Sequence, residues 1–147
     1  MKNVDTNDVK NAVKHYRDVL GFNVIPLRAG TKSSAIKWKE FQERKPTDEE
    51  FENIGIVTGK ASRLAVADVD NPKRLEGWLE ENGLELRDTA TVKTARGFHY
   101  YYRIPEGVEV RSKDVGDALE LKANGSYVVA PPSTMVKSGR DRKGIDY

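Results

Sequence analysis

The first apolar positions of the chain recur at the spacing of a helix. Asn7 is of a type favoured at the helix N-cap, and Gly21 is of a type favoured just beyond the last turn. The apolar positions between them are Val9, Val13, Tyr16, Val19 and Leu20. This pattern predicts a helix that ends before Gly21, followed by a strand over the apolar run at residues 22–27.

A polar loop separates this strand from the next one. Residues 28–45 contain few apolar side chains and several turn residues. The segment from Thr47 to Glu50 has the form of a capping box, which predicts a short helix ending near Asn53. The apolar run at residues 54–58, closed by Gly59, predicts a second strand.

Helix and strand signals alternate through the second half of the chain. Residues 64–70 predict a buried strand, and Asn71 with Pro72 supplies the N-cap and first-turn proline of a helix that runs to about Gly83. Further strands are predicted at residues 90–94, 98–104, 108–111, 118–122 and 127–130. The mixed order predicts an α+β fold, and the charged residues 137–147 predict a frayed tail.

Length, charge and cysteine content limit the class of protein. The 147 residues fit one domain or one compact pair of small units. The net charge of +2 is too small to attract polyanions in general, so affinity for nucleic acid must come from local clusters of cations. The lack of cysteine excludes a disulfide framework and a thiolate zinc site. Because the sequence has neither a signal-peptide core nor a membrane-length apolar run, we expect a soluble, cytoplasmic protein.

Two carboxylates stand two residues apart at the end of the strand predicted at residues 64–70. The strand period of two puts Asp68 and Asp70 on one face. Oxygen ligands suit Mg²⁺ or Mn²⁺, and two such ions about 3.5–4 Å apart are the usual clamp for attack at phosphorus. The pattern is common, however, and Asp70 before Asn71 and Pro72 also fits a plain strand end.

A turn with cations and a glycine leads into an aromatic strand. Lys93, Arg96 and Gly97 precede His99, and cationic side chains with backbone N–H groups around a glycine are what a triphosphate requires. We therefore predict that these four residues bind a nucleotide. A single histidine on a strand also often has a structural role, which is the alternative for His99.

Two further features have more than one interpretation. Glu120 stands between leucines on the strand predicted at residues 118–122, where a carboxylate faces solvent or pairs with Lys122. Cations outnumber anions in the loop at residues 28–45, and a basic loop can bind the phosphates of DNA. The candidate DNA-binding residues are Lys32, Lys37, Lys39 and Arg44. Trp38 in the same loop either anchors it in the core or stacks on a base.

The order of these pieces resembles the N-terminal domain of bifunctional DNA primase-polymerases, in the archaeo-eukaryotic primase superfamily. The matching segments are residues 21–26 with Lys37 and Trp38, then residues 53–59, 66–70, 94–99 and 125–133. The specific signal is Asp-x-Asp, then Arg-Gly-x-His, then an acidic residue before Pro-Pro-Ser. The resemblance implies an RRM-like catalytic sheet at residues 60–134, packed with a small N-terminal αβ unit at residues 1–59. Residues 135–147 would form a basic tail.

The resemblance also implies a two-metal nucleotidyl transfer in DNA replication. Asp68, Asp70 and Glu120 match the metal-binding acidic positions of the family, so Mg²⁺ or Mn²⁺ is expected and zinc is not. His99 matches the histidine that binds the nucleotide phosphates, with Arg96 in support. The implied partners are nucleoside triphosphates, a single-stranded DNA template in the cleft between the units, and a helicase domain or subunit outside this chain.

The sequence departs from the family pattern at two positions, and two alternative functions stay open. Phe98 stands where a glycine often follows Gly97, and Glu120 stands where aspartate is common. One alternative function is a non-catalytic nucleotide or single-stranded DNA binding module of the same fold. The other is a metal-dependent nuclease, because Asp70 with Glu120 and Lys122 fits the loose pattern of Asp followed by Glu-x-Lys.

Overall fold

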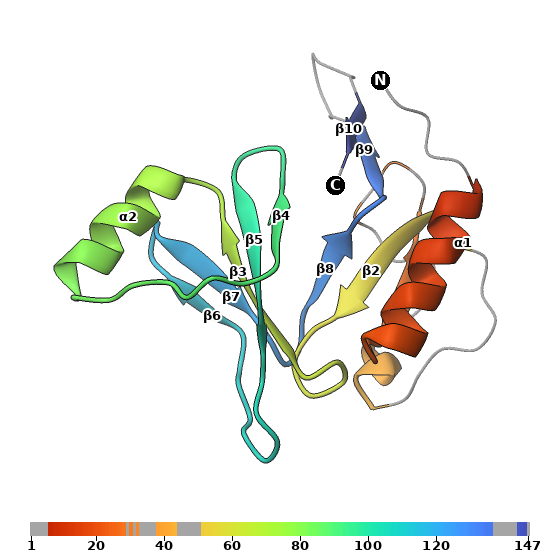
Figure 1. The fold of residues 1–147 in the computed structure, drawn as a ribbon, viewed down its shortest axis with the longest axis horizontal. Coiled ribbons are helices and arrows are strands. Elements are labelled where there is room, and N and C mark those ends of the chain that lie inside the picture. Colours follow the sequence, from red (N-terminus) through yellow and green to blue (C-terminus); the bar gives the residue numbers. More distant parts are fainter. Residues whose placement is uncertain are drawn as a thin grey trace.

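Two antiparallel sheets, each with a helix beside it, form the body of the protein (Figure 1). The computed structural model describes residues 6–28, 30, 32, 38–43, 51–136 and 144–146. Its helices are α1 (Thr6–Lys14), the π-helix η1 (His15–Val19), the 3₁₀ helix η2 (Lys39–Gln42) and α2 (Pro72–Glu81). Its strands are β1 (Val24–Leu27), β2 (Asn53–Val57), β3 (Leu64–Val69), β4 (Thr91–Lys93), β5 (Phe98–Arg103), β6 (Lys113–Val115), β7 (Leu119–Lys122), β8 (Tyr127–Ala130), β9 (Thr134–Val136) and β10 (Gly144–Asp146).

The strand order confirms the predicted α+β class. One sheet has the order β1-β2-β8, a second has the order β4-β5-β3-β7-β6, and β9 pairs with β10 in a separate hairpin. Strand β8 crosses from the second half of the chain to pair with β2. Residues 127–130, which we assigned to the second unit, therefore belong to the sheet of the N-terminal unit. No helix in the described part of the chain combines the length and apolarity needed to cross a bilayer.

The first helix agrees with its apolar spacing but differs at both ends. It begins at Thr6, so Asn7 lies inside the helix and not at the predicted N-cap. Its last five residues widen into the π-helix η1, in which Leu20 N–H donates to His15 C=O at 3.2 Å. Gly21 then takes a φ of +69°, the left-handed conformation that glycine adopts without strain. The predicted helix stop at this residue is confirmed.

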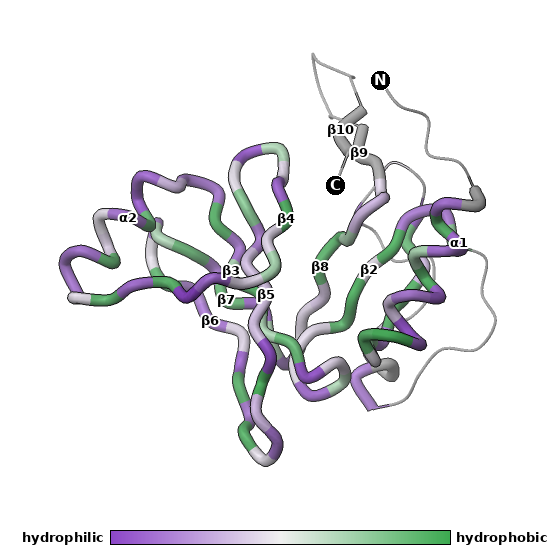
Figure 2. Tube along the Cα trace, viewed as in Figure 1, coloured by the Kyte–Doolittle hydropathy of each residue, from purple (hydrophilic) through white to green (hydrophobic). Residues whose placement is uncertain are grey.

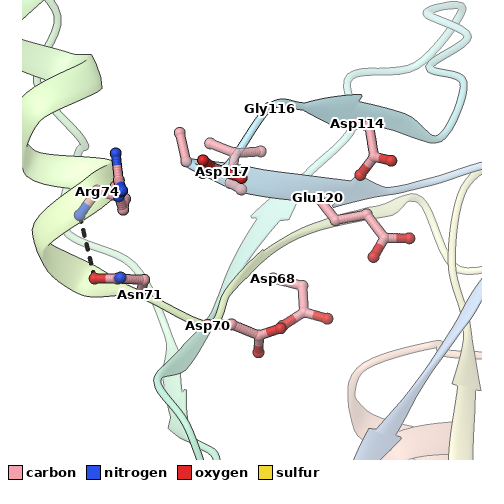
Figure 3. Close-up of a pocket in the computed structure, with 10 residues that line it drawn as sticks. Asp68, Asp70, Asn71, Arg74, Asp114, Gly116, Asp117 and Glu120 are labelled. Carbon is pink, nitrogen blue, oxygen red and sulfur yellow. Dashed lines mark hydrogen bonds between the residues drawn. The ribbon is translucent and has the colours of Figure 1, made fainter.

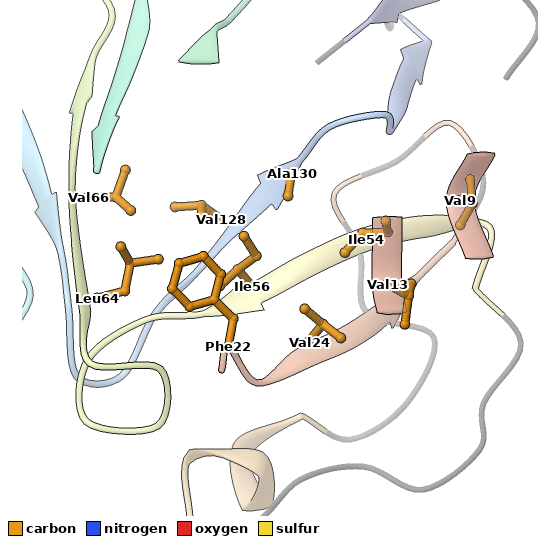
Figure 4. Close-up of a cluster of buried hydrophobic side chains, with 10 residues drawn as sticks. All are labelled: Val9, Val13, Phe22, Val24, Ile54, Ile56, Leu64, Val66, Val128 and Ala130. Atoms are coloured by element: carbon orange, nitrogen blue, oxygen red, sulfur yellow. The ribbon is translucent and has the colours of Figure 1, made fainter. Parts of the chain in front are cut away.

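One apolar core joins the two sheets. Figure 4 shows α1, the three-stranded sheet and β3 contributing to the same cluster. Its fully or almost fully buried members are Val9, Val13, Phe22, Val24, Ile54, Ile56, Leu64, Val66, Val128 and Ala130. Strands β2 and β8 are hydrophobic along most of their length (Figure 2), as expected of strands that are buried on both faces. A second cluster covers the opposite face of the three-stranded sheet.

Two polar contacts tie the segment after β8 to the N-terminal unit. The fully buried Ser133 hydroxyl accepts a hydrogen bond from the Ile54 N–H at 2.8 Å and donates to the Ile54 carbonyl at 3.3 Å. The Tyr16 hydroxyl donates to the Pro131 carbonyl at 2.7 Å, and burial raises the pKa of this phenol to about 12. The Pro-Pro-Ser segment therefore has a structural role in closing the first sheet.

Several predicted elements lie elsewhere. Residues 108–111 form no strand, and the neighbouring strand is β6, which pairs with β7. Strand β6 has no apolar alternation because it lies at an exposed sheet edge. The helix predicted from Thr47 lies mostly outside the described residues, but Asn53, its predicted end, begins β2. Strand β10 lies in the tail that we expected to be frayed.

Candidate active site

A row of polar side chains crosses the five-stranded sheet. Strand pairing places Asp68 of β3 directly opposite Glu120 of β7 on one side and His99 of β5 on the other. Glu120 in turn lies opposite Asp114 of β6. Directly opposed residues of antiparallel strands project to the same face, with Cβ atoms about 4.5–5.5 Å apart. Four strands therefore present three carboxylates and an imidazole on one face.

Strand β3 explains why this row lies at the edge of the core. Leu64 and Val66 are buried in the main cluster, and the strand period of two puts Asp68 on the same face. At Asp68 the core ends, and its side chain is 22% exposed. The sequence thus converts an apolar face into a polar one within a single strand.

The central pair of the row is Asp68 and His99. The His99 Nε2 atom lies 3.4 Å from Asp68 Oδ1, and the histidine side chain is only 8% exposed. Burial by itself would raise the pKa of the Asp68 carboxyl. The hydrogen bond and charge of His99, together with the charges of Lys122 and Lys32, outweigh burial and hold this pKa below its usual range. Asp68 is therefore held as a carboxylate.

The Glu120 carboxylate of this row has a partner on its own strand. Lys122 Nζ lies 2.8 Å from Glu120 Oε1, and 46% of the Glu120 side chain is exposed. Lys122 and Glu120 are two residues apart, so they share a face of β7. Pairing of Glu120 with its neighbouring lysine, one interpretation of the sequence, is confirmed, and it leaves Glu120 half-exposed beside Asp68.

An acidic pocket of about 430 Å³ opens beside the carboxylates (Figure 3). Its acidic side chains are Asp68, Asp70, Asp114, Asp117 and Glu120. Among the residues that line it, Arg74 of α2 is the cation. Asn71, also in the wall, caps α2 by accepting a hydrogen bond from the Arg74 N–H at 3.3 Å. The pocket concentrates negative charge in a way that suits cations.

A second pocket of about 300 Å³ has the opposite character. It lies where the two sheets meet, and it contains Asp68 together with His99, Lys32 and Lys122. The remaining wall comes from Trp38 and the segment that leads into β8. Since Asp68 lines both pockets, the carboxylates and the cationic groups meet at this one residue.

Gly97 has a packing role in the turn before β5. A Cβ atom there would lie 2.9 Å from the Val69 carbonyl carbon and 3.3 Å from the Asp70 Cα, and closer still to the Val69 oxygen. The Gly97 N–H donates to Thr94 Oγ1 at 3.1 Å, so it is already used inside the turn. The close approach of β5 to the end of β3 accounts for glycine at this position.

The sequence of the chain was also compared with models of protein families. The model described as bifunctional DNA primase/polymerase, N-terminal, matches residues 12–144. The chain belongs to this family. Among curated proteins, none matches the sequence. Membership in the primase/polymerase family indicates a nucleotidyltransferase type of activity, as the family description suggests.

A primase/polymerase domain is expected to hold divalent metal ions, and the donors of the acidic pocket suit them. All of its acidic side chains offer carboxylate oxygens, the ligands that Mg²⁺ and Mn²⁺ prefer. No group of three or more potential ligands among the described residues is yet close enough to hold an ion. The Glu120 Oε1 atom contacts Lys122 Nζ, so one of the two oxygens of this carboxylate is already engaged.

The other predicted site residues of this primase/polymerase domain lie in three places. Lys93 at the end of β4 and Arg96 on the turn before β5 are both exposed, and they line neither of the two pockets. Lys32 lines the cationic pocket, whereas the exposed Lys39 of η2 lines neither. Two further predicted residues, Lys37 and Arg44, lie outside the described residues. The nucleotide and template roles of these side chains stay predictions.

Several lining residues were not identified from the sequence. Asp114 and Asp117 were missed because the neighbouring strand was predicted at residues 108–111, out of register with β7. Lys122 was interpreted only as a partner of Glu120. Its place in the wall of the cationic pocket depends on the pairing of β3 with β7. Tyr127 was interpreted as part of an apolar strand.

Proposed function

We propose that the protein is a template-dependent nucleotidyltransferase that joins nucleotides on single-stranded DNA during replication. The observation that carries this proposal is the position of Asp68, which lines both the acidic and the cationic pocket. Transfer of a nucleotide needs a place for metal ions and a separate but adjacent place for the triphosphate. In this proposal the five-stranded sheet is the RRM-like catalytic sheet that the family resemblance implies.

The acidic pocket would hold the metal ions. Asp68, Asp70 and Glu120 would be the ligands, because all three line that pocket and the first and third are opposed across β3 and β7. When bound, two divalent ions neutralise phosphate charge and favour the ionised form of the attacking hydroxyl. The low pKa of the Asp68 carboxyl suits a ligand that must be charged at neutral pH.

The cationic pocket would hold the phosphates of the nucleotide. His99 Nε2 and the ammonium groups of Lys32 and Lys122 are donors in its wall. In the reaction the 3′ hydroxyl of the primer loses its proton to water and its oxygen bonds to the α-phosphorus. The bond from that phosphorus to the α,β-bridging oxygen breaks, and pyrophosphate leaves. Lys122 would exchange Glu120 for a phosphate oxygen, which would free the Glu120 carboxylate to turn toward Asp68.

The second candidate function is a non-catalytic module that binds nucleotide or single-stranded DNA. It is favoured by the Lys122–Glu120 ion pair, in which a lysine already engages one of the proposed metal ligands. If the pair does not open when nucleotide binds, the cationic pocket would bind phosphates without transfer. The two candidates therefore differ in whether Glu120 changes its partner.

One experiment separates these candidates from each other and from the nuclease alternative. The protein is incubated with primed or unprimed single-stranded DNA, Mn²⁺ and labelled nucleotides. Metal-dependent extension supports the proposal, shortening of the DNA supports a nuclease, and binding without either supports the module. Protein with His99→Ala should bind nucleotide more weakly by about 1–3 kcal/mol and single-stranded DNA equally well, because it loses a hydrogen bond to a charged group.

A further inference from the structure

The cationic pocket has an aromatic wall that phosphate binding does not use. Trp38 and Tyr127 line this pocket together with His99, Lys32 and Lys122. Phosphate oxygens need the three donors, but they gain nothing from two rings. A cavity of about 300 Å³ is at the lower end of the range for small-molecule sites. It has room for more than an anion.

The two rings are held in a fixed arrangement. Their centroids are 4.9 Å apart and their planes are inclined by 76°, which is an edge-to-face contact. Both side chains are half-buried and pack on the second apolar cluster, whose members include Ile25 and Val129. Ring positions fixed in this way lose little conformational entropy when a flat ligand binds.

The aromatic wall and the cations are parts of one assembly. The Tyr127 hydroxyl donates to the Lys32 carbonyl at 2.5 Å, so the residue that carries one of the cations is tied to the ring. On the other side, Tyr127 is fixed by its pairing with Val57 in the three-stranded sheet. A ligand with an aromatic part and an anionic part would contact both.

We propose that Trp38 and Tyr127 bind the base of the nucleoside triphosphate whose phosphates lie against Lys32, Lys122 and His99. This inference rests on the proposed function, and it identifies the base-binding part of that site. Every base has a π-face, so stacking on these rings would bind all four nucleotides. Base choice would then be left to the template.

A base of the single-stranded template is the other possible occupant of the aromatic wall. The nucleotide is favoured because the rings share one cavity with His99 and Asp68, the two residues at the centre of the polar row. Of the predicted template contacts among the described residues, Lys32 lines this cavity and Lys39 does not.

Tryptophan fluorescence tests the proposal directly. The protein has two tryptophans, Trp38 and Trp78, so Trp78→Phe leaves Trp38 as the single reporter. Trp78 lies in α2 and does not line the cationic pocket, so this substitution is also the matched control. ATP, CTP, inorganic tripolyphosphate and single-stranded DNA are titrated in a buffer with Mg²⁺, and their affinities are measured by calorimetry.

The expected result is that ATP and CTP quench Trp38, whereas tripolyphosphate binds without quenching. Trp38→Ala should weaken ATP binding about tenfold, which corresponds to about 1.4 kcal/mol, and should leave tripolyphosphate binding unchanged. Trp38→Phe should keep most of the ATP affinity, because it keeps a ring. This second variant and the single-tryptophan protein keep the test decisive if Trp38→Ala does not fold.

Three results would overturn the proposal. They are an unchanged ATP affinity in Trp38→Ala, an equal loss of ATP and tripolyphosphate affinity, and quenching by DNA but not by ATP. Failure of the proposed function has a different signature. In that case tripolyphosphate does not bind the unmodified protein, or His99→Ala leaves its affinity unchanged.

Discussion

Replacement of Gly97 by alanine tests how the fold brings the site together. The added Cβ would be 2.9 Å from the Val69 carbonyl carbon and closer still to its oxygen. Carbon atoms in favourable contact are about 3.5–4.0 Å apart, so the start of β5 must move away from β3 by about 1 Å. Neither contact atom is at the end of a flexible side chain, because both belong to the backbone of β3.

The cost follows from this overlap. Overpacking of a tight contact costs about 1–3 kcal/mol, and the Thr94–Gly97 hydrogen bonds of 2.9 and 3.1 Å would be weakened as well. We expect Gly97→Ala to lower the free energy of unfolding by about 3 kcal/mol. For a domain of this size that corresponds to a fall of about 10 °C in Tm.

Gly77 supplies a matched control with the opposite sign. It lies inside α2, is exposed, and has no atom within 4 Å of the position of an added Cβ. Gly77→Ala should therefore stabilise the protein by about 0.5–1 kcal/mol through helix propensity alone. Urea unfolding of both variants, followed by circular dichroism, measures the two changes.

The same pair of variants separates packing from phosphate binding at this turn. If Gly97 serves only to expose an N–H to a phosphate, Gly97→Ala would keep its stability and lose nucleotide affinity. A free energy of unfolding within about 0.5 kcal/mol of the original protein, the range of an ordinary surface substitution, would refute the packing argument. Tripolyphosphate titration of the folded variant gives the second readout.

Two further predictions concern the contacts that close the first sheet. Burial raises the pKa of Tyr16 to about 12 from the ordinary value of 10.0, so its contribution to stability is complete below pH 10 and is lost as the pH rises toward 12. The free energy of unfolding, measured in urea from pH 9 to 12, should fall by up to about 1.4 kcal/mol per pH unit. Tyr16→Phe should make this dependence shallower, and an identical slope would contradict the assignment. Ser133→Ala should lower the free energy of unfolding by about 1–3 kcal/mol, because the buried Ile54 N–H loses the Ser133 hydroxyl as its acceptor. A change below about 0.5 kcal/mol in urea unfolding would show that this contact is unimportant.

The elements that could be predicted from the sequence carry their own signals. Strand β3 begins with the apolar run at residues 64–67. Helix α2 begins after Asn71 with a proline in its first turn, and the capping hydrogen bond of Asn71 confirms this start. The prediction at residues 108–111 was wrong because pairing with β7, and not apolar content, determines where β6 forms. Local patterns do not contain that information. The π-helix at the end of α1 likewise had no signal in the apolar spacing.

The candidate site could likewise be predicted only in part. Asp68 and His99 were identified as candidates from the residues themselves, and the metal role of Glu120 was predicted through the family resemblance. Strand pairing brings the three together in one row. The two pockets could not be predicted, because their walls combine segments that lie far apart in the sequence: β3, α2 and β7 in the acidic pocket, and Lys32 and Trp38 with strands from the second half of the chain in the cationic pocket. Trp38 lies beside Tyr127 only after β8 has paired with β2.

Metal-dependent primer extension by an Asp68→Asn variant is the sharpest test of whether the polar row takes part in nucleotide transfer. Asparagine keeps the size of the side chain and removes the charge that the row depends on. Asp88→Asn is the control, because Asp88 is exposed and lines neither pocket. Asp68→Asn should remain folded and lose about 100-fold or more of the incorporation rate, while Asp88→Asn keeps it. Undiminished incorporation by a folded Asp68→Asn protein would exclude Asp68, and with it the polar row, from nucleotide transfer.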